Sequence, residues 1–499
     1  MTYYVGSNKQ VFINWDLIEP GYGVAWKGER PTSREMPYGI QLRVKPPRLD
    51  KTPIIQSDRP WETFINCYAT MFEDDGIYRL YYESYYREPS DEPSDLTAML
   101  SYAESTDGVN WVKPELGQVE FKGSTANNIV YALDVSRGRG SHGGTVFKDP
   151  SAPPEERYKL IHMGRENGVM RVFGATSPDG IRWTAIEKHL IDNYMSDTQT
   201  IVRYDADKGK YVGYFRAWRG YEAGKWHGRR AIAYAETEDF RNWPRPEIIV
   251  EPNLSDAPEV DIYTNGYSLW PGTNNAHLMF PAFYQRTYDV TQTLMYTSRD
   301  GIHWDRPQHE PIIPAGEPGT GWEGGVYAGC GLVSLNPGEV SLLVGPKWHT
   351  HNEGHYPEGR PEPPPDRGHL ALATWRQDGF MALEAESLGS FTTAPMVFEG
   401  SQLKLNAWTR FGGEIRVEVI DPEADVYSVI DVGNEYLDFN SNSNAAEGYT
   451  LNDCEPFTGD SLEHIVKWNG TADLSQWAGQ PIRLRFWMRR ARLFSLQFV

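Results

Sequence analysis

Short apolar runs, each bounded by turn-forming residues, follow one another along most of the chain. Five of them have the length and aromatic content of strands: "GIYRLYYESYY" (76–86), "ERYKLIHMG" (156–164), "GKYVGYFRAW" (209–218), "NAHLMFPAFY" (275–284) and "GEVSLLVGPKW" (338–348). Another apolar run precedes each of these across a turn such as "FEDDG" or "SLNPGE". Runs of this kind between turn signals are typical of β-strands, and no segment has a convincing helical pattern. The sequence therefore predicts an all-β fold.

A second turn follows each predicted hairpin and repeats as a recognisable phrase. It reads "AESTDGVNW" (103–111), "ATSPDGIRW" (175–183), "AETEDFRNW" (235–243) and "TSRDGIHW" (297–304), with a degenerate copy in "ATWRQDGFM" (373–381). Asp-Gly between apolar runs is a strong hairpin signal, because Gly accepts positive φ and Asp bonds its own turn backbone. Five copies at intervals of 60 to 78 residues indicate a repeat architecture.

Four short strands in each of five repeats predict a five-bladed β-propeller over residues 55–380. A single blade cannot bury both of its faces, so the ring must close. Residues 1–54 are expected to pack on the ring or to help close it, and "QVFINWDLI" (10–18) is the segment considered for this role. Residues 381–499 contain longer alternating strands and predict a C-terminal β-sandwich, which either supports the propeller or binds sugar itself.

Charge and composition narrow the classes of partner. The chain of 499 residues has a net charge of −20 and no visible basic stripe, which argues against nucleic acid. No apolar run approaches the roughly 20 residues that cross a bilayer. Seventeen Trp and 29 Tyr supply the core, but such rings in an acidic chain are also typical of surfaces on which sugars stack.

Neither disulfides nor a secretion signal is predicted. Cys67, Cys330 and Cys454 are odd in number and widely spaced, so they indicate neither a disulfide framework nor a zinc site. The first residues lack a basic region followed by an apolar stretch. The expected location is cytoplasmic if this N-terminus is native, and periplasmic or secreted if a signal has been removed.

Acidic residues stand where the predicted blades begin. The first strand of a propeller blade starts near the central axis, and the link from the second to the third strand returns to the same face. Four of the five predicted first strands carry a carboxylate at this point, and the second carries a histidine: Glu62, Asp197, Asp261 (with Glu259 as its alternative) and Glu323, and His142. Acids that converge on an axis shift one another's pKa, so one is protonated while another stays ionised. Cleavage of a glycosidic bond requires such a pair.

Substrate-binding residues are expected beside these acids and at the ends of second strands. They are Asn66, His142, Gln199, Arg216, Trp218, Arg286, Lys347, Trp348 and His349. Arg and Lys can bind hydroxyl or anionic groups, and Trp can stack on a sugar ring. The acids of the first hairpin turns, including Asp74 and Asp149, are expected to be structural because Asp is a turn former.

The loop "KWHTHNEGHYPEGRPEPPPDRG" (347–368) contains three histidines. His349, His351 and His355, with Glu353, are residue types that bind metals. Histidines at alternate loop positions more often form hydrogen bonds or line a pocket. The sequence therefore predicts no metal and no other cofactor.

With five blades and central acids, the chain resembles the five-bladed propeller glycoside hydrolases. These include the invertase and inulinase family, which also has a C-terminal β-sandwich, and the arabinanase and β-xylosidase family. "RPWETFIN" (59–66) stands where the invertase pattern "WxNDPNG" would be, and "SDTQ" (196–199) replaces its "EC" motif. The run "PWE … SDTQ … SRDGIHW" is similar to a bacterial group of homologues. The resemblance implies Glu62 as nucleophile or base and Asp197 as general acid.

The sequence thus favours an exo-acting glycoside hydrolase whose substrate is a plant or microbial oligo- or polysaccharide. One alternative is a phosphorylase of the mannoside type, with Arg216, Arg286 and Lys347 forming the phosphate pocket. Another is a sugar-binding propeller without catalysis. A sialidase is less favoured, because the turn phrase only approximates its Asp-box. Glycan release measured with and without phosphate distinguishes the first three.

Overall fold

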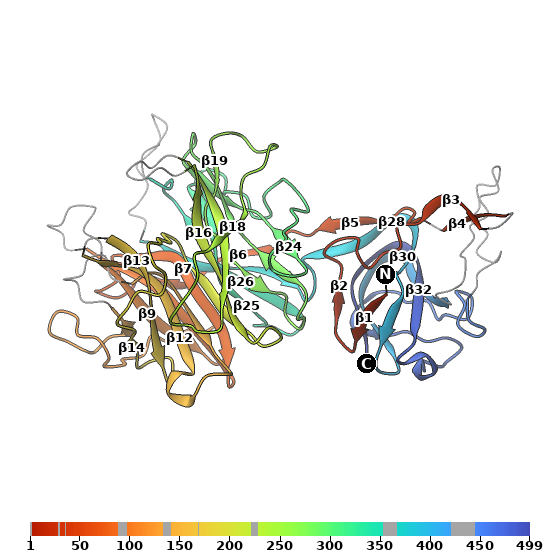
Figure 1. Ribbon diagram of the computed structural model, residues 1–499, viewed down its shortest axis with the longest axis horizontal. Coiled ribbons are helices and arrows are strands. Elements are labelled where there is room, and N and C mark those ends of the chain that lie inside the picture. The colour runs from red at the N-terminus through yellow and green to blue at the C-terminus, as the bar shows by residue number, and fades with distance from the viewer. Residues whose placement is uncertain are drawn as a thin grey trace. The chain divides into compact units, whose positions relative to one another are not determined.

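The computed structural model describes residues 2–27, 30–34, 36–87, 97–132, 141–167, 169–220, 228–352, 367–420 and 445–499. Within these ranges the regular structure is β-strand apart from two single turns of 3₁₀-helix, η2 (Pro154–Glu156) and η3 (Ser475–Trp477) (Figure 1). The predicted all-β class is confirmed. The described residues contain no helix long and apolar enough to span a membrane.

The chain divides into two compact units. Unit 1 comprises Met1–Lys45, Trp270–Ala276 and Arg376–Val499, and unit 2 comprises Pro46–Leu269 and His277–Trp375. The sequence-predicted site residues all belong to unit 2, so the description of the site is a description of this unit.

The first three strand sets of unit 2 are antiparallel meanders, in which strands adjacent in sequence are adjacent in the sheet. The first set is β7 (Phe64–Asp74), β8 (Ile77–Tyr86), β9 (Thr97–Ser105) and β10 (Ile129–Tyr131). The second is β11 (His142–Lys148), β12 (Tyr158–Glu166), β13 (Val169–Ser177) and β14 (Thr184–Ala185). The third is β15 (Ile201–Asp205), β16 (Lys210–Arg219), β17 (Arg229–Thr237) and β18 (Glu247–Val250).

The fourth set is interrupted. Its strands β19 (Val260–Ile262), β22 (Ala282–Gln285) and β23 (Val290–Thr293) pair with one another, as do β20 (Ser268–Leu269), β21 (His277–Met279) and β24 (Tyr296–Ser298). Pro281 lies between β21 and β22. Proline has no N–H to donate to a ladder, which accounts for the break in the predicted strand 275–284.

The fifth set includes a strand that lies far upstream in the sequence. It contains β25 (Gly325–Val333), β26 (Glu339–Lys347) and β27 (His369–Arg376), and β27 pairs antiparallel with β6 (Arg48–Gln56). Ile55 of β6 is buried in one apolar cluster with Leu370 and Leu372. The early segment that joins these sets is therefore β6. Segment 10–18 instead lies in unit 1, where Phe12 and Ile18 enter the core.

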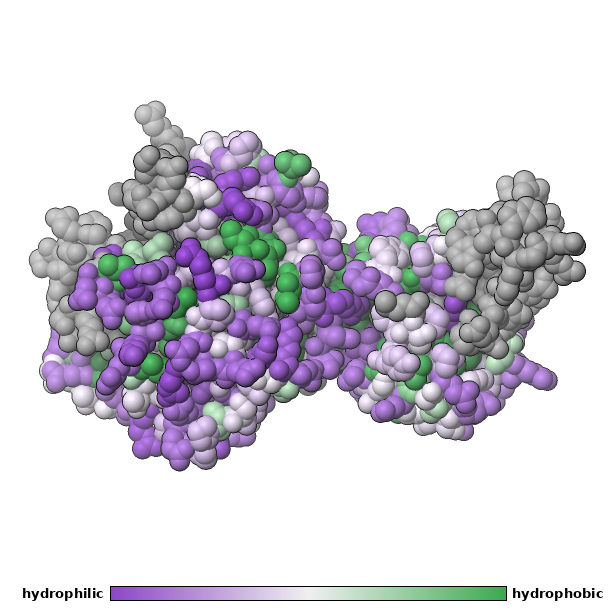
Figure 2. Space-filling model, in the orientation of Figure 1, coloured by the Kyte–Doolittle hydropathy of each residue, from purple (hydrophilic) through white to green (hydrophobic). Residues whose placement is uncertain are grey.

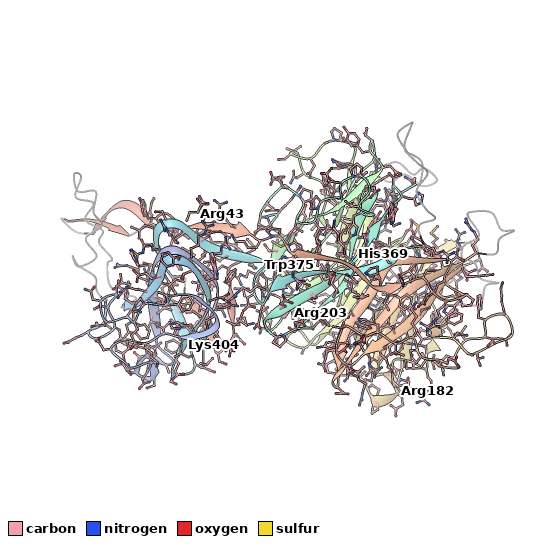
Figure 3. All side chains as sticks on the ribbon, turned by 180° about the vertical axis from the view of Figure 1, so that it is seen from behind. Arg43, Arg182, Arg203, His369, Trp375 and Lys404 are labelled. Atoms are coloured by element: carbon pink, nitrogen blue, oxygen red, sulfur yellow. The ribbon has the colours of Figure 1, made fainter. Side chains whose placement is uncertain are left out.

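The first, second and fourth turn phrases fold alike. In the second copy, Asp179 Oδ1 accepts the backbone N–H groups of Ile181 (2.9 Å) and Arg182 (2.8 Å), and Trp183 Nε1 donates to the Gly180 carbonyl at 3.1 Å. The same bonds close the phrases at 105–111 and 298–304. Arg182, labelled in Figure 3, marks this turn at the edge of unit 2. The phrase recurs because each copy satisfies its own backbone.

The turns also join neighbouring sets. Gly180 has a φ of +79°, and a Cβ added there would lie 2.4 Å from Tyr81 Oη of β8. Turn acids contact the set that follows their own. Asp149 of the second set accepts a hydrogen bond from the Tyr211 hydroxyl of β16 at 2.6 Å, and Asp74 of the first set accepts one from the Tyr158 hydroxyl of β12. These turn acids therefore stabilise the packing of one set against the next.

Unit 1 contains the longest strands of the chain. The main path of its sheet has the order β1 (Tyr3–Gly6), β29 (Met396–Phe398), β32 (Pro481–Phe498), β28 (Met381–Thr392) and β5 (Gln41–Val44). The strands β2 (Gln10–Val11) and β30 (Leu403–Ile420) also pair with β32, and β31 (Asp460–Ile465) pairs with β30. A separate hairpin is formed by β3 (Tyr22–Lys27) and β4 (Arg30–Arg34). Buried rings fill the core, with Phe398 stacked on Phe498 at 3.9 Å. The surface in Figure 2 is mostly hydrophilic, in keeping with the net charge of −20.

A single methyl group at Gly180 is expected to destabilise the protein. Gly180→Ala combines a left-handed backbone, which costs about 1–2 kcal/mol, with overlap on Tyr81, which costs about 1–3 kcal/mol. Gly117→Ala is the matched control, because Gly117 has a φ of +68° but nothing within 4 Å of the added Cβ. Urea unfolding followed by Trp fluorescence should show the larger loss at Gly180. Equal losses would mean that the contact with Tyr81 is not tight.

Candidate functional site

Three side chains from different strand sets of unit 2 form a continuous chain of contacts. Glu83 lies near the end of β8, His142 opens β11, and Asp197 lies in the segment before β15. His142 Nδ1 is 3.0 Å from Glu83 Oε1, and His142 Nε2 is 3.2 Å from Asp197 Oδ1. The imidazole thus bridges two carboxylates, one buried and one at the surface of the site.

Burial distinguishes the two carboxylates. The Glu83 side chain is 1% exposed, and it also accepts Asn66 Nδ2 at 2.9 Å and the backbone N–H of Gly143. The Asp197 side chain is 31% exposed. Glu83 therefore positions the imidazole, and Asp197 is the carboxylate that a ligand can reach.

The charges of Glu83, His142 and Asp197 stabilise one another. Burial favours a neutral imidazole, but the charge of Glu83 and the hydrogen bond to Asp197 raise the pKa of His142 to about 10. Burial alone would raise the pKa of Asp197, but His142, Arg216 and Arg230 hold that pKa well below its usual range. At neutral pH the site therefore contains an imidazolium between two carboxylates.

Two arginines flank Asp197. The Arg216 guanidinium, on β16, lies 3.9 Å from the centre of the Tyr263 ring and donates through Nε and one terminal nitrogen to the Tyr263 carbonyl, at 3.2 and 2.9 Å. Arg230, on β17, lies 4.6 Å from the Trp218 ring and 4.5 Å from Tyr263. The stacked rings fix both guanidinium groups near the exposed carboxylate.

Asp261 does not present a free carboxylate. It is fully buried and accepts hydrogen bonds from Arg230 (2.6 Å), from the backbone N–H of Arg230 (2.8 Å) and from Arg286 (3.0 and 2.7 Å). Asp261 therefore anchors two arginines, and Arg286, expected to bind substrate, is engaged in this clamp.

Glu62 is likewise engaged in structure. Its side chain is fully buried, and Lys113 donates to both oxygens at 2.9 and 2.8 Å. The Tyr82 hydroxyl donates to it at 2.6 Å, and the backbone N–H groups of Asp58 and Arg59 donate at 3.0 and 3.2 Å. A carboxylate with this many partners stabilises the loop before β7.

Glu323 closes its own turn. It is half-buried and accepts the backbone N–H groups of Gly319 (3.0 Å) and Gly321 (2.7 Å). Of the four acids expected at the blade entrances, only Asp197 joins the chain of Glu83 and His142.

The remaining predicted residues line or brace the same region. Gln199 donates to the Ala69 carbonyl at 2.9 Å, and Lys347 lies 5.4 Å from the rings of both Phe64 and Tyr327. Trp348 packs over Gly321, and the His349 backbone packs against Gly324. Asn66, which holds Glu83, is thus a positioning residue.

His351 is a further residue of the histidine-rich loop that lies at the site. The His351 ring lies 4.7 Å from Tyr263 and bonds the Tyr327 hydroxyl at 2.7 Å. Burial, with the charge of Lys347, lowers the pKa of His351 to about 3, so the ring is neutral. Glu353 and His355 lie outside the described residues. No group of three or more His, Cys, Asp or Glu suited to a metal ion occurs in the part that the structure describes.

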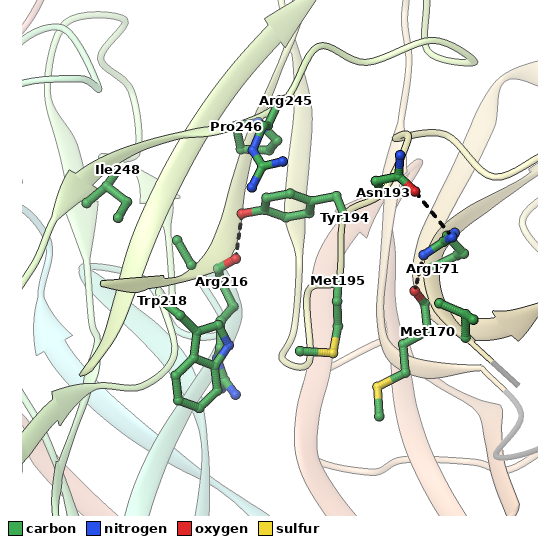
Figure 4. A pocket seen from close by; sticks show the side chains of 12 residues that line it. Met170, Arg171, Asn193, Tyr194, Met195, Arg216, Trp218, Arg245, Pro246 and Ile248 are labelled. Carbon is green, nitrogen blue, oxygen red and sulfur yellow. Dashed lines mark hydrogen bonds between the residues drawn. The ribbon is translucent and has the colours of Figure 1, made fainter. Parts of the chain in front are cut away.

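A cavity of about 650 Å³ lies between the second and third strand sets, and Arg216 and Trp218 are among the residues that line it. Figure 4 shows Arg216 and Trp218 on one side, Arg171 on the other, and Tyr194 between them. Arg245 also lines it, and the Tyr194 hydroxyl donates to the Arg216 carbonyl at 2.6 Å. A pocket of about 300–1,000 Å³ has the size that small organic ligands occupy.

Sequence reasoning missed Glu83, Arg230 and Tyr263. Glu83 is an acid inside the aromatic strand "YYESYY" (81–86), and a charged residue among buried positions must have a partner. That signal was available. Arg230 and Tyr263 had no comparable signal, because arginines and tyrosines are frequent throughout the chain.

No protein-family model and no curated protein matches this chain. Solved structures do match. One, a glycoside hydrolase, is 13% identical and covers 66% of this chain and 92% of its own, with a TM-score of 0.48. A glycosyl hydrolase from Bacteroides ovatus is 12% identical and covers 67% and 94%, with a TM-score of 0.43.

A third match comes from work on the GH130 family of mannoside phosphorylases, which contains glycoside hydrolases that target β-1,2-mannosidic linkages. It is 13% identical and covers 66% of this chain and 93% of its own, with a TM-score of 0.43. At these identities and TM-scores the likeness carries no argument about function.

Removing the charge of Glu83 is expected to lower the pKa of His142. In Glu83→Gln the negative charge that favours the imidazolium is gone, while burial still opposes it. Histidine NMR titration should show His142 titrating below the wild-type value of about 10. Glu166→Gln, beside the more exposed His189, is the control and should leave His142 unchanged. An unaltered His142 in Glu83→Gln would contradict the assigned contact.

Proposed function

We propose that the five strand sets of unit 2 close into a five-bladed propeller, that unit 1 forms a β-sandwich, and that the group around Asp197 cleaves glycosidic bonds. The ring is supported by contacts between the first and fifth sets. The strands β7 and β25 pair in parallel at Thr70 and Cys330, and a Cβ on Gly108 would lie 2.6 Å from Leu335.

The partly exposed, ionised carboxylate of Asp197 is the observation on which the catalytic proposal rests. A carboxylate held in this state suits a base or a nucleophile, whereas a general acid must be protonated. We therefore assign Asp197 the base or nucleophile role, in place of the acid role that the resemblance implies. Glu62, Glu323 and Asp261 are assigned structural roles.

Hydrolysis at this site replaces one bond with another. In the base role, Asp197 takes a proton from water as the water oxygen bonds to the anomeric carbon, the bond to the leaving sugar breaks, and the leaving oxygen takes a proton from solvent. In the nucleophile role, Asp197 bonds that carbon as the bond to the leaving sugar breaks and the leaving oxygen takes a proton from solvent; water then bonds the carbon and the bond to Asp197 breaks. In both roles, His142 and Glu83 keep Asp197 oriented and ionised. Trp218 offers a ring on which a sugar face can stack.

A phosphorylase is the second candidate, and the arginine-lined cavity is the observation that favours it. In phosphorolysis a phosphate oxygen, instead of water, bonds to the anomeric carbon. Arg286 is engaged by Asp261, so of the residues first considered for a phosphate pocket only Arg216 and Lys347 are retained. Release of sugar that depends on added phosphate, with a sugar phosphate as product, would identify this reaction.

Asp197→Asn is expected to lower turnover by at least about a hundredfold, the lower end of what a general acid–base group contributes. The amide keeps the shape but cannot act as base or nucleophile. Sugar release from a panel of oligosaccharides, with and without phosphate, measures the effect. Asp149→Asn is the control, because Asp149 bonds Tyr211 in a turn between sets and its loss should change stability more than turnover. Full activity in Asp197→Asn would refute the proposal.

Glu62→Gln separates a structural role from a catalytic one. Removing one charge of the buried pair with Lys113 is expected to lower stability by about 1–3 kcal/mol, while folded protein keeps turnover within about tenfold of wild type. Thermal melting and steady-state kinetics on the same preparation test both parts. A hundredfold loss of turnover without loss of stability would restore the catalytic role that the resemblance implies.

A further inference from the structure

We propose that the cavity beside Asp197 binds a sugar that carries a carboxylate, so that the substrate is an acidic, uronic-acid-containing glycan. This inference rests on the proposed glycosidase function and adds its substrate class. The shared chemistry that the site recognises is an oxyanion attached to, or lying near, a sugar ring.

The lining of the cavity has a one-sided charge. Arg171 of β13, Arg216 of β16 and Arg245 before β18 all line it, and no carboxylate stands among the described residues of its wall. The chain as a whole has 68 acidic and 48 basic residues. Three arginines therefore line one space in a chain with an excess of acidic residues, and a guanidinium group binds carboxylate and phosphate through paired hydrogen bonds.

Two of these arginines have donors that the protein leaves unused. Arg216 is 1% exposed, and one of its terminal nitrogens has no hydrogen-bond partner. Arg171 Nε is also buried without a partner, although its terminal nitrogens reach the Met170 carbonyl (3.2 Å) and Asn193 (3.5 Å). Buried donors of a charged group are costly when unpaired. Neither nitrogen is exposed to solvent, so an anion in the cavity pairs with them only if the two side chains turn toward it.

The rest of the wall is apolar and large enough for a ring. Trp218, Met170 and Met195 line the space between the arginines, and Figure 4 shows Met195 beside Tyr194 in the middle of the wall. A volume of about 650 Å³ exceeds what a free phosphate or sulfate ion fills. The combination of apolar wall and arginine donors fits a sugar ring with an attached anionic group better than an inorganic ion.

Arg216 connects the cavity to the reacting carboxylate. It lines the cavity, and its charge contributes to the lowered pKa of Asp197. Met195 lines the cavity and Asp197 follows it by two residues, so we assign the cavity to a sugar that adjoins the bond to be cleaved. The anionic group then pairs with the arginines on the side away from Asp197.

Binding, measured by calorimetry, tests this without relying on turnover. The probes are galacturonate, glucuronate, galactose, glucose and inorganic phosphate, each added to the full chain. The uronates are expected to bind at least tenfold more tightly than the matching neutral sugars and than phosphate. Arg171→Met and Arg245→Met should each weaken uronate binding about tenfold and leave neutral sugars unchanged. Arg410→Met, an exposed arginine of unit 1, is the control and should bind like wild type.

Each other outcome has a defined meaning. Equal binding of uronate and neutral sugar would overturn the proposal, and so would phosphate binding as tight as uronate binding, which would indicate a site for free phosphate. Asp197→Asn should keep uronate binding. If uronate binds but wild type cleaves no glycan, the proposed function fails while the cavity assignment stands. If only neutral glycans are cleaved and uronate does not bind, the reverse holds.

Discussion

Each strand set of unit 2 has two apolar faces, and only neighbouring sets can cover them. The buried clusters reflect this constraint. One joins Leu100 of the first set to Leu160 of the second, another joins Ile161 to Phe215 of the third, and a third joins Leu80 to Leu343 of the fifth. The Asp-Gly turns and their Tyr partners add polar contacts to the same interfaces. Because these clusters join neighbouring sets, they also bring together the segments that carry Glu83, His142 and Asp197.

A second constraint selects the functional groups. A charge removed from water needs a partner, and most acids of unit 2 near the site have one. Glu62 is matched by Lys113, and Asp261 by two arginines. Asp197 also has a partner in His142, but it keeps contact with solvent. Exposure, and not the presence of an ion pair, therefore distinguishes Asp197 from Glu62 and Asp261.

The cavity and the carboxylate use the arginines differently. Arg230 and Arg286 donate to Asp261, whereas Arg171, Arg216 and Arg245 line the cavity. In the proposed site an anionic ligand would pair with Arg171 and Arg245, while the charge of Arg216 helps to keep Asp197 ionised. An acidic protein can bind an acidic sugar in this way because the basic groups are local and partly shielded from solvent.

Much of the fold of this protein could be predicted from short stretches of its sequence. The all-β class, the hairpins and the Asp-Gly turns follow from side-chain propensities over a few residues, and the position of Asp197 and His142 at strand entrances follows from the repeat. Tertiary structure alone decided the rest. Lys113 reaches Glu62 across 51 positions, His142 reaches Glu83 across 59, and β6 joins β27 from the far end of the unit. Which acid has a cationic partner, and where the arginines of the cavity meet, depends on such distant contacts, because the free energy of a buried charge is set by its surroundings and not by its neighbours in sequence.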